Sequence, residues 1–119
     1  MTDITKLVSS LSDLPNIHPT EGCTMRRFGG EQVMLQEATM PKGATFEAHS
    51  HHNEQLVIVL SGKLRLDVGE DATPVVLETG QMMLLPPHVA HGGEALEDCR
   101  LLDAFSPPRT TVLSEAEED

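Results

Sequence analysis

The sequence contains no tryptophan and no tyrosine, and only three phenylalanines among its 119 residues. A mechanism that needs a tyrosine acid, base or radical is therefore excluded, and stacking on an aromatic wall can involve only Phe28, Phe46 or Phe105. Basic residues are also scarce, because 8 Lys and Arg stand against 19 Asp and Glu, a formal net charge of −11. Phosphate backbones and anionic membrane surfaces repel such a chain, so we expect neither nucleic acid nor membrane as a partner.

The sequence also lacks long hydrophobic runs and paired cysteines. The longest uninterrupted aliphatic run, Leu56–Leu60, is far shorter than the roughly 20 apolar residues of a membrane-spanning helix. Asp3 and Lys6 precede any apolar block, so we expect no secretion signal and a cytoplasmic protein. Cys23 and Cys99 have neither a disulfide framework nor CxxC spacing, and we expect both to be buried as small hydrophobic residues.

From Met25 onward, short runs typical of β-strands recur between turn signals. The runs are 32–40, 45–51, 55–60, 63–68, 75–78, 81–85 and 100–105. Close, even spacing of this kind predicts an all-β antiparallel barrel or sandwich. The run Leu56–Leu60 is apolar at every position, as in a strand covered on both faces. A second sheet or a partner subunit would cover it, and with Met82–Leu85 it predicts a homodimer face.

The chain divides by composition into three parts. Residues 1–20 carry only a short helix-like spacing that Pro15 closes, and they predict an N-terminal lead-in segment. Residues 21–113 hold all the strand-like runs and predict one β-barrel domain. Residues 114–119, SEAEED, predict a solvated acidic tail.

The histidines are clustered, and the first cluster lies in AHSHHNEQ, residues 48–55. On an extended strand, residues two apart share a face, so His49 and His51 can offer two imidazoles to one ion while His52 points elsewhere. Glu54 or Gln55 can add an oxygen donor on the same side. These residues predict part of a metal site.

The second cluster, PPHVAH, supplies His88 and His91. His91 on a neighbouring strand could complete a set of three or four protein ligands. Imidazole nitrogen suits Zn, Ni, Mn, Fe or Cu, so we expect one divalent transition metal without naming it. His88 could lie behind a ligand or at the rim of the pocket and touch substrate.

Two stretches resemble the motifs of the cupin family. Gly43-ATFEA-His49-Ser-His51-HNE-Gln55-LVIVLS-Gly62 resembles the first motif, and Gly80-QMMLL-Pro86-PHVA-His91 resembles the second. The resemblance implies a double-stranded β-helix, a jelly-roll barrel, with one metal in its mouth. Its ligands would be His49, His51, Gln55 and His91, since only Gln55 and not Glu54 keeps the six-residue spacing to the closing glycine.

The sequence departs from the cupin pattern at two positions. Gln55 replaces the acidic ligand of the first motif, and Ala95 stands where the longer second motif often has asparagine. Three neutral histidines and a neutral amide leave the +2 charge of the ion uncompensated. This ligand set favours a Lewis acid that binds anionic or polyhydroxylated oxygen ligands, and it disfavours oxygen activation at iron.

A narrower resemblance covers Ala95-LEDCRLLDAFSPP-Arg109, which is similar to the KdgF-type pectin degradation proteins. These small cupins convert 4,5-unsaturated monouronates into linear keto sugars. The aspartate, phenylalanine and arginine that line the substrate pocket of that family match Asp103, Phe105 and Arg109. By this resemblance Arg109 would bind the uronate carboxylate and act in catalysis, Asp103 would move the proton of ketonisation, and Phe105 would pack on the sugar.

The sequence leaves three functions open. The first is metal-dependent ketonisation of an unsaturated uronate or a related small acidic sugar. The second is a non-catalytic cupin that binds a metal and a small carboxylate. The third is a cupin dioxygenase, against which the amide at position 55 and the absence of tyrosine both argue.

Overall fold

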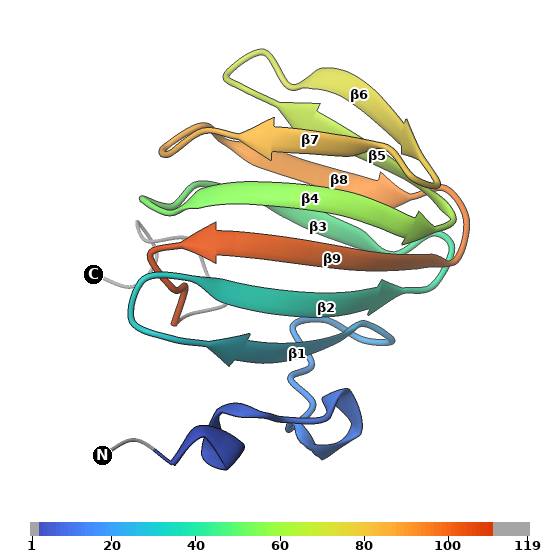
Figure 1. Cartoon of the computed structure of the whole chain (residues 1–119). Coiled ribbons are helices and arrows are strands. Elements are labelled where there is room, and N and C mark those ends of the chain that lie inside the picture. Colours follow the sequence, from blue (N-terminus) through green and yellow to red (C-terminus); the bar gives the residue numbers. More distant parts are fainter. Residues whose placement is uncertain (1–2, 111–119) are drawn as a thin grey trace.

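In the computed structural model, which describes residues 3–110, two short 3-10 helices precede two antiparallel β-sheets that pack face to face (Figure 1). The helices are η1 (Ile4–Leu7) and η2 (Leu11–Asp13). The strands are β1 (Thr24–Gly29), β2 (Met34–Met40), β3 (Thr45–His49), β4 (Glu54–Ser61), β5 (Lys63–Val68), β6 (Thr73–Glu78), β7 (Met82–Leu85), β8 (His91–Ala95) and β9 (Cys99–Ser106). No helix of residues 3–110 has the length and apolar character needed to cross a membrane.

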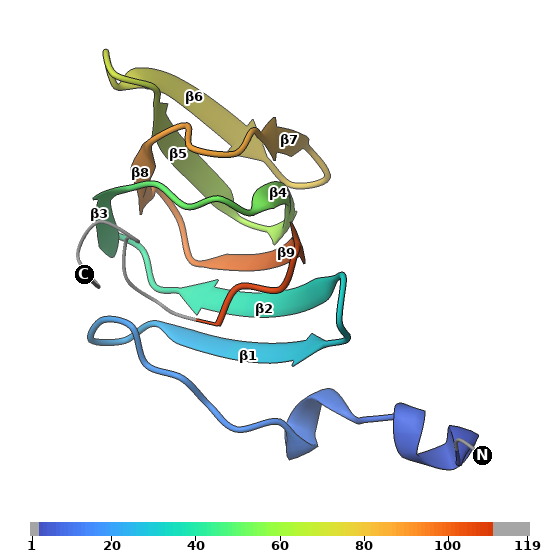
Figure 2. The same cartoon turned by 90° about the vertical axis from the view of Figure 1, so that its left-hand side faces the viewer.

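The chain passes back and forth between the two sheets. One sheet has the strand order β1-β2-β9-β4-β7 and the other β3-β8-β5-β6. In Figure 2, β3 and β8 of one sheet lie to the left and β4 and β9 of the other lie to the right, while β2 and β1 continue the five-stranded sheet below them. This arrangement confirms the predicted all-β jelly roll. The predicted acidic tail, 114–119, and the end of the predicted barrel, 111–113, lie outside the described residues.

Side chains alternate between the interior and the outer surface along each strand of the five-stranded sheet, as the two-residue period of a strand requires. Paired residues on neighbouring strands share a face, so the register arranges side chains in rows. One inward row is Arg27, Gln36, Asp103, Val57 and Met83, and the adjacent outward row is Phe28, Leu35, Ala104, Leu56 and Leu84. The inward row is polar on β1, β2 and β9 and apolar on β4 and β7.

The interior between the sheets is filled mainly by aliphatic side chains. Val57 and Val59 on β4 are 3% and 0% exposed, whereas Leu56 is 52% exposed on the opposite face. The apolar run 56–60 is therefore covered on one face only within the described chain. A partner subunit over the outer face stays a prediction.

The structure differs from the predicted elements at three places. The predicted run 45–51 ends as a strand at His49, so His51 lies in the following loop. Strand β1 was not predicted, and β8 was expected only as the neighbouring strand that carries His91, without a range. In β1 the pair Arg26-Arg27 hides the alternation, and β8 contains Gly92 and Gly93, which have low β-propensity.

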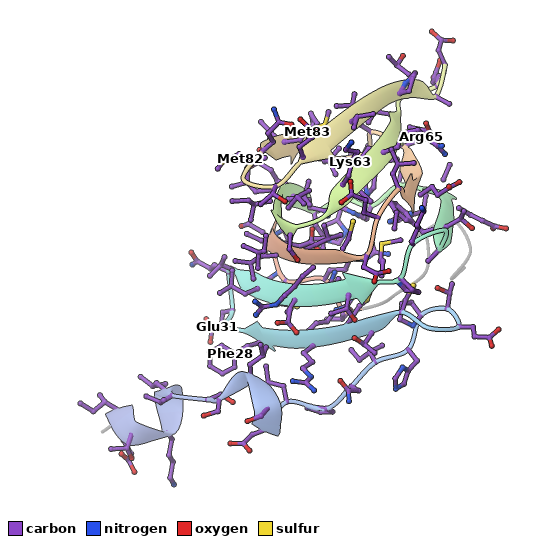
Figure 3. All side chains as sticks on the ribbon, turned by 90° about the vertical axis from the view of Figure 1, so that its right-hand side faces the viewer. Phe28, Glu31, Lys63, Arg65, Met82 and Met83 are labelled. Carbon is purple, nitrogen blue, oxygen red and sulfur yellow. The ribbon has the colours of Figure 1, made fainter. Side chains whose placement is uncertain are left out.

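The N-terminal segment forms 3-10 turns with exposed apolar side chains. Ile4 and Leu7 are 73% and 60% exposed, so this segment adds little to the core. Figure 3 shows Phe28 near this segment, and Phe28 lines a shallow groove together with Leu11 and Leu14. Cys23 and Cys99 are free and buried, as the sequence predicts.

Candidate metal and ligand site

Three histidines from two strands and a loop meet at one end of the barrel. His49 ends β3 and His91 begins β8, and the two are paired across these strands. His51 follows in the loop from β3 to β4. The ring centroids of His49 and His91 lie 4.5 Å apart and those of His51 and His91 lie 5.0 Å apart. One ligand atom from each of the three lies within 4.8 Å of the others, so these histidines could hold a metal ion.

Backbone carbonyls determine which ring nitrogen of each histidine can bind a metal. The Nδ1 atoms of His49, His51 and His91 lie 3.1, 3.0 and 3.0 Å from the carbonyl oxygens of Glu47, Asn53 and Val89. A carbonyl oxygen only accepts, so Nδ1 carries the hydrogen and Nε2 carries the lone pair. Among residues 3–110, Nε2 of His91 is buried without a hydrogen-bond partner, as expected of an atom that binds a metal ion.

Gln55 supplies an oxygen beside these nitrogens. Its side-chain nitrogen donates to Oδ1 of Asp103 at 3.0 Å, and its Oε1 lies 3.1 Å from Nε2 of His51. Both of these facing atoms are acceptors when His51 is neutral, so their lone pairs repel unless a cation lies close to both. This contact fits a metal ion and explains why Gln55, 9% exposed, is the ligand candidate rather than the exposed Glu54.

Burial keeps His51 and His91 neutral at neutral pH. Desolvation, followed by the positive charge of Arg109, lowers the pKa of His51 to about 4. Desolvation, followed by repulsion from His49, lowers the pKa of His91 to about 4. A metal ion therefore meets unprotonated imidazoles over most of the physiological range, which favours binding.

Asp103 lies behind Gln55 and is 4% exposed. Its two carboxylate oxygens accept hydrogen bonds from the side-chain amides of Gln36, at 2.9 Å, and Gln55, at 3.0 Å. Burial raises the pKa of Asp103 to about 6, although both amide bonds oppose this rise. A group with a pKa close to neutrality can exchange a proton with a ligand, and an ionised carboxylate that accepts two bonds still has acceptor capacity.

The histidines, Gln55, Asp103, Phe105 and Arg109 all line one cavity of about 390 Å³. Phe105 is 3% exposed, and its ring meets that of His51 edge to face at 5.7 Å. Arg109 is 5% exposed and follows the end of β9. The cavity continues between the sheets along apolar side chains such as Met25, Ala38 and Met40. The structure thus brings together all four predicted ligands and the three predicted pocket residues.

Two predicted residues lie away from this group. His88 has an exposed side chain in the turn between β7 and β8 and does not line the cavity, although its backbone N–H donates to the carbonyl of His51 at 2.8 Å. Its predicted contact with substrate receives no support from this position. His52 is exposed as well, in keeping with the prediction that it points elsewhere.

Arg27 and Gln36 line the same cavity and were not identified from the sequence. A weak signal existed for Arg27, because two adjacent arginines on one strand must face opposite sides, and one of them then faces inward. Gln36 occupies the position on β2 between Arg27 and Asp103 in the inward row. No local pattern distinguishes its amide from an ordinary surface glutamine.

Comparison with known proteins places this site in a recognised fold. The model of the cupin domain family, Cupin_2, matches residues 36–105. An RmlC-like cupin from Shewanella frigidimarina is 27% identical, with a TM-score of 0.77 over 86% of this chain and 91% of that one. KdgF from Halomonas sp. is 24% identical, with a TM-score of 0.74 over 82% of this chain and 92% of that one. No curated protein matches the sequence.

Proposed function

The chain belongs to the cupin domain family, and we propose that it binds one divalent transition metal and ketonises a 4,5-unsaturated monouronate or a closely related small acidic sugar. The observation that carries the proposal is the convergence of His49, His51, Gln55 and His91 with Asp103, Phe105 and Arg109 on one cavity. The likeness to the Halomonas KdgF supports the fold, and the residues of the Asp103–Arg109 stretch support the activity.

The three histidines and Gln55 would hold the ion, and the facing acceptors of His51 and Gln55 support this assignment. A divalent ion bound there would act as a Lewis acid that stabilises negative charge on ring or hydroxyl oxygens of the ligand. The ligand set brings no negative charge, so an anionic ligand is favoured. Zn, Ni, Mn and Fe all suit such a set.

The reaction is an isomerisation without oxidant or reductant. The ring opens when the bond between the anomeric carbon and the ring oxygen breaks and the anomeric hydroxyl loses its proton. The ring oxygen leaves as an enolate, which then gains one proton on carbon and becomes a ketone. Asp103, with its pKa raised by burial to about 6, is suited to accept the first proton or deliver the second.

Arg109 and Phe105 would orient the sugar in this reaction. A guanidinium presents two parallel N–H donors that match the oxygens of a uronate carboxylate. Arg109 places such a group in a cavity where burial strengthens its attraction for an anion. Phe105 offers an apolar ring beside His51, against which the carbon face of the sugar can pack.

A non-catalytic cupin that binds a metal and a small carboxylate is the second candidate. The hydrogen bonds of Asp103 favour it, because both of its oxygens already hold glutamine amides. In this case Asp103 would only position Gln55. The ligand and the protein would form a stable complex with no product.

The test combines metal analysis with a turnover assay. Protein purified without a chelating column is analysed for metals, then incubated with unsaturated monouronates while the ultraviolet absorbance of the conjugated alkene is followed. Metal-dependent acceleration of its loss, abolished in Arg109→Gln but retained in the surface variant Arg100→Gln, is the expected result. Metal-dependent binding without turnover supports the second candidate, oxygen consumption supports a dioxygenase, and absence of metal binding contradicts all three.

A further inference from the structure

Arg27 brings a second guanidinium into the cavity, on the opposite side of Asp103 from the metal site. It lies on β1 in register with Gln36, which in turn pairs with Asp103 on β9. Its Nε donates to Oε1 of Gln36 at 2.7 Å, and its NH1 group donates to the backbone oxygen of Arg109 at 3.4 Å. Arg27 therefore lies beside residue 109 and lines the same cavity.

The partners of Arg27 are unusual for a half-buried cation. Both oxygens that accept from it are uncharged, and within residues 3–110 Arg27 forms no ion pair. The nearest carboxylate in the row, Asp103, is separated from it by the amide of Gln36. Desolvation and then the charge of Arg109 lower the pKa of Arg27, so the two guanidinium groups repel each other. An anion between them would relieve both costs.

The charge of the cavity contrasts with that of the whole chain. The protein carries a net charge of −11, yet its cavity is lined by Arg27, Arg109 and a candidate metal site, with Asp103 as its one buried carboxylate among residues 3–110 and Glu47 as an exposed one. Arg27 is half-buried beside a second guanidinium and donates only to uncharged oxygens, an arrangement that an anionic ligand would stabilise. This contrast indicates that the ligand brings negative charge to the guanidinium side of the cavity.

We propose that Arg27 and Arg109 together bind the carboxylate of the ligand, so that Arg27 determines the preference for an acidic sugar over its neutral counterpart. Two guanidinium groups can donate to both oxygens of one carboxylate, and such charge-assisted bonds are about twice as strong as neutral ones. The sugar ring would then lie between this pair and the histidines. This inference rests on the proposed function for the identity of the ligand as a monouronate.

The test is equilibrium binding by calorimetry, with the nickel-loaded full chain and two non-reacting probes, D-galacturonate and D-galactose. We expect the wild type to prefer galacturonate, and Arg27→Gln to lose roughly 10- to 100-fold in galacturonate affinity, as the loss of a hydrogen bond to a charged group predicts. Galactose binding should not change. Arg26→Gln is the matched control, because Arg26 is the neighbouring arginine on β1 and bonds to Asn16 outside the cavity.

Nickel affinity separates this role from a purely structural one. Because Arg27 also donates a hydrogen bond to Gln36, replacing Arg27 could weaken ligand binding indirectly, by displacing Asp103 and Gln55. Unchanged nickel affinity in Arg27→Gln together with weaker galacturonate binding supports the proposal, and Arg27→Lys should restore part of the binding. Three results would overturn it. The first is an equal loss of affinity for galactose, galacturonate and nickel in Arg27→Gln. The others are an unchanged galacturonate affinity in Arg27→Gln and a wild type that binds no galacturonate.

The two proposals can fail separately. If the wild type binds galacturonate through Arg27 but never converts an unsaturated uronate, the ketonisation fails and the carboxylate site stands. If the wild type converts unsaturated uronates and Arg27→Gln does so with unchanged KM, the carboxylate site fails and the ketonisation stands.

Discussion

Gln55 donates its side-chain N–H to Asp103 across 3.0 Å, and this bond determines which atom of Gln55 faces the histidines. An ionised carboxylate only accepts, so the amide nitrogen turns to Asp103 and the amide oxygen turns to His51. Gln36 is oriented in the same way, with its nitrogen on Asp103 and its oxygen on Arg27. Asp103 thus directs the amide oxygen of Gln55 towards His51 on one side and that of Gln36 towards Arg27 on the other.

Replacing Asp103 by asparagine should weaken metal binding. An asparagine side chain offers one acceptor oxygen and one donor NH2 group, so it cannot accept from both glutamine amides at once. Gln55 then loses the bond that directs its oxygen to His51. We expect Asp103→Asn to bind nickel or zinc roughly 10- to 100-fold more weakly, the usual cost of losing a group that orients a ligand. Competition with a chromophoric chelator measures this change.

Asp67→Asn is the control for that variant, because Asp67 lies on β5 in an ion pair with Arg65. It should bind metal as the wild type does. If Asp103→Asn retains full metal affinity but loses turnover at saturating metal, Asp103 acts on the substrate and does not position Gln55.

The metal-free protein should lose stability as the pH falls from about 6.5 to about 4. His51 and His91 have a pKa of about 4 in the folded state, against an ordinary value of 6.5. Between these values the unfolded chain binds more protons, so acidification favours unfolding. Asp103 acts in the opposite direction, because its pKa rises from 3.8 to about 6 on folding. Two histidines outweigh one carboxylate, so the net effect is a loss.

Urea unfolding of metal-free protein at pH 7 and pH 5 measures this dependence. His91→Gln should flatten it, and Asp103→Asn should steepen it. A wild type with the same free energy of unfolding at both pH values would show that burial does not depress the histidine pKa values.

Much of the site could be predicted because the glycines limit the spacing of its ligands. Gly62 follows the end of β4, with six residues between it and Gln55, and the pairing of His49 with His91 follows once β3 and β8 are neighbours. Arg27 could not be predicted in this way. Its place in the cavity depends on the pairing of β1 with β2. That pairing extends along the whole strand and corresponds to no short sequence motif.

The two glycines of the first motif should differ in their tolerance of alanine. Gly43 and Gly62 both have positive φ, +90° and +97°. A Cβ on Gly43 meets nothing within 4 Å, whereas a Cβ on Gly62 would overlap the carbonyl oxygen of Asp98. We expect Gly43→Ala to cost about 1–2 kcal/mol of unfolding free energy from backbone strain alone. Gly62→Ala should cost about 2–5 kcal/mol, since overpacking adds to the strain.

Chemical denaturation of the two alanine variants side by side gives the comparison. Equal losses would mean that the chain between β8 and β9 moves aside at little cost. In that case Gly62 would be required for its conformation and not for the close approach of Asp98.

Leu56 and Leu84 are paired on β4 and β7 and lie half exposed, at 52% and 50%, in the outward row that runs across all five strands of the sheet. This row also contains Phe28, Leu35 and Ala104, and none of its members is charged. Burial of such a surface gains about 25 cal/mol per Å² of apolar area. We propose that a second copy of the chain covers this row, because two acidic proteins can approach along an uncharged row, whereas the next outward row carries Arg26 and Glu37 on β1 and β2.

We therefore expect a homodimer through this face, and Leu56→Glu should convert it to a monomer. The substitution places a like charge from each copy near the symmetry axis and removes apolar area, while the exposed side chain makes folding insensitive to the change. Val76→Glu is the matched control, because Val76 is 48% exposed on the other sheet. Sedimentation equilibrium over a range of concentrations should give a dimer for the wild type and Val76→Glu and a monomer for Leu56→Glu. A wild type that is monomeric throughout, or a Leu56→Glu variant that stays dimeric, would contradict the assignment of this face.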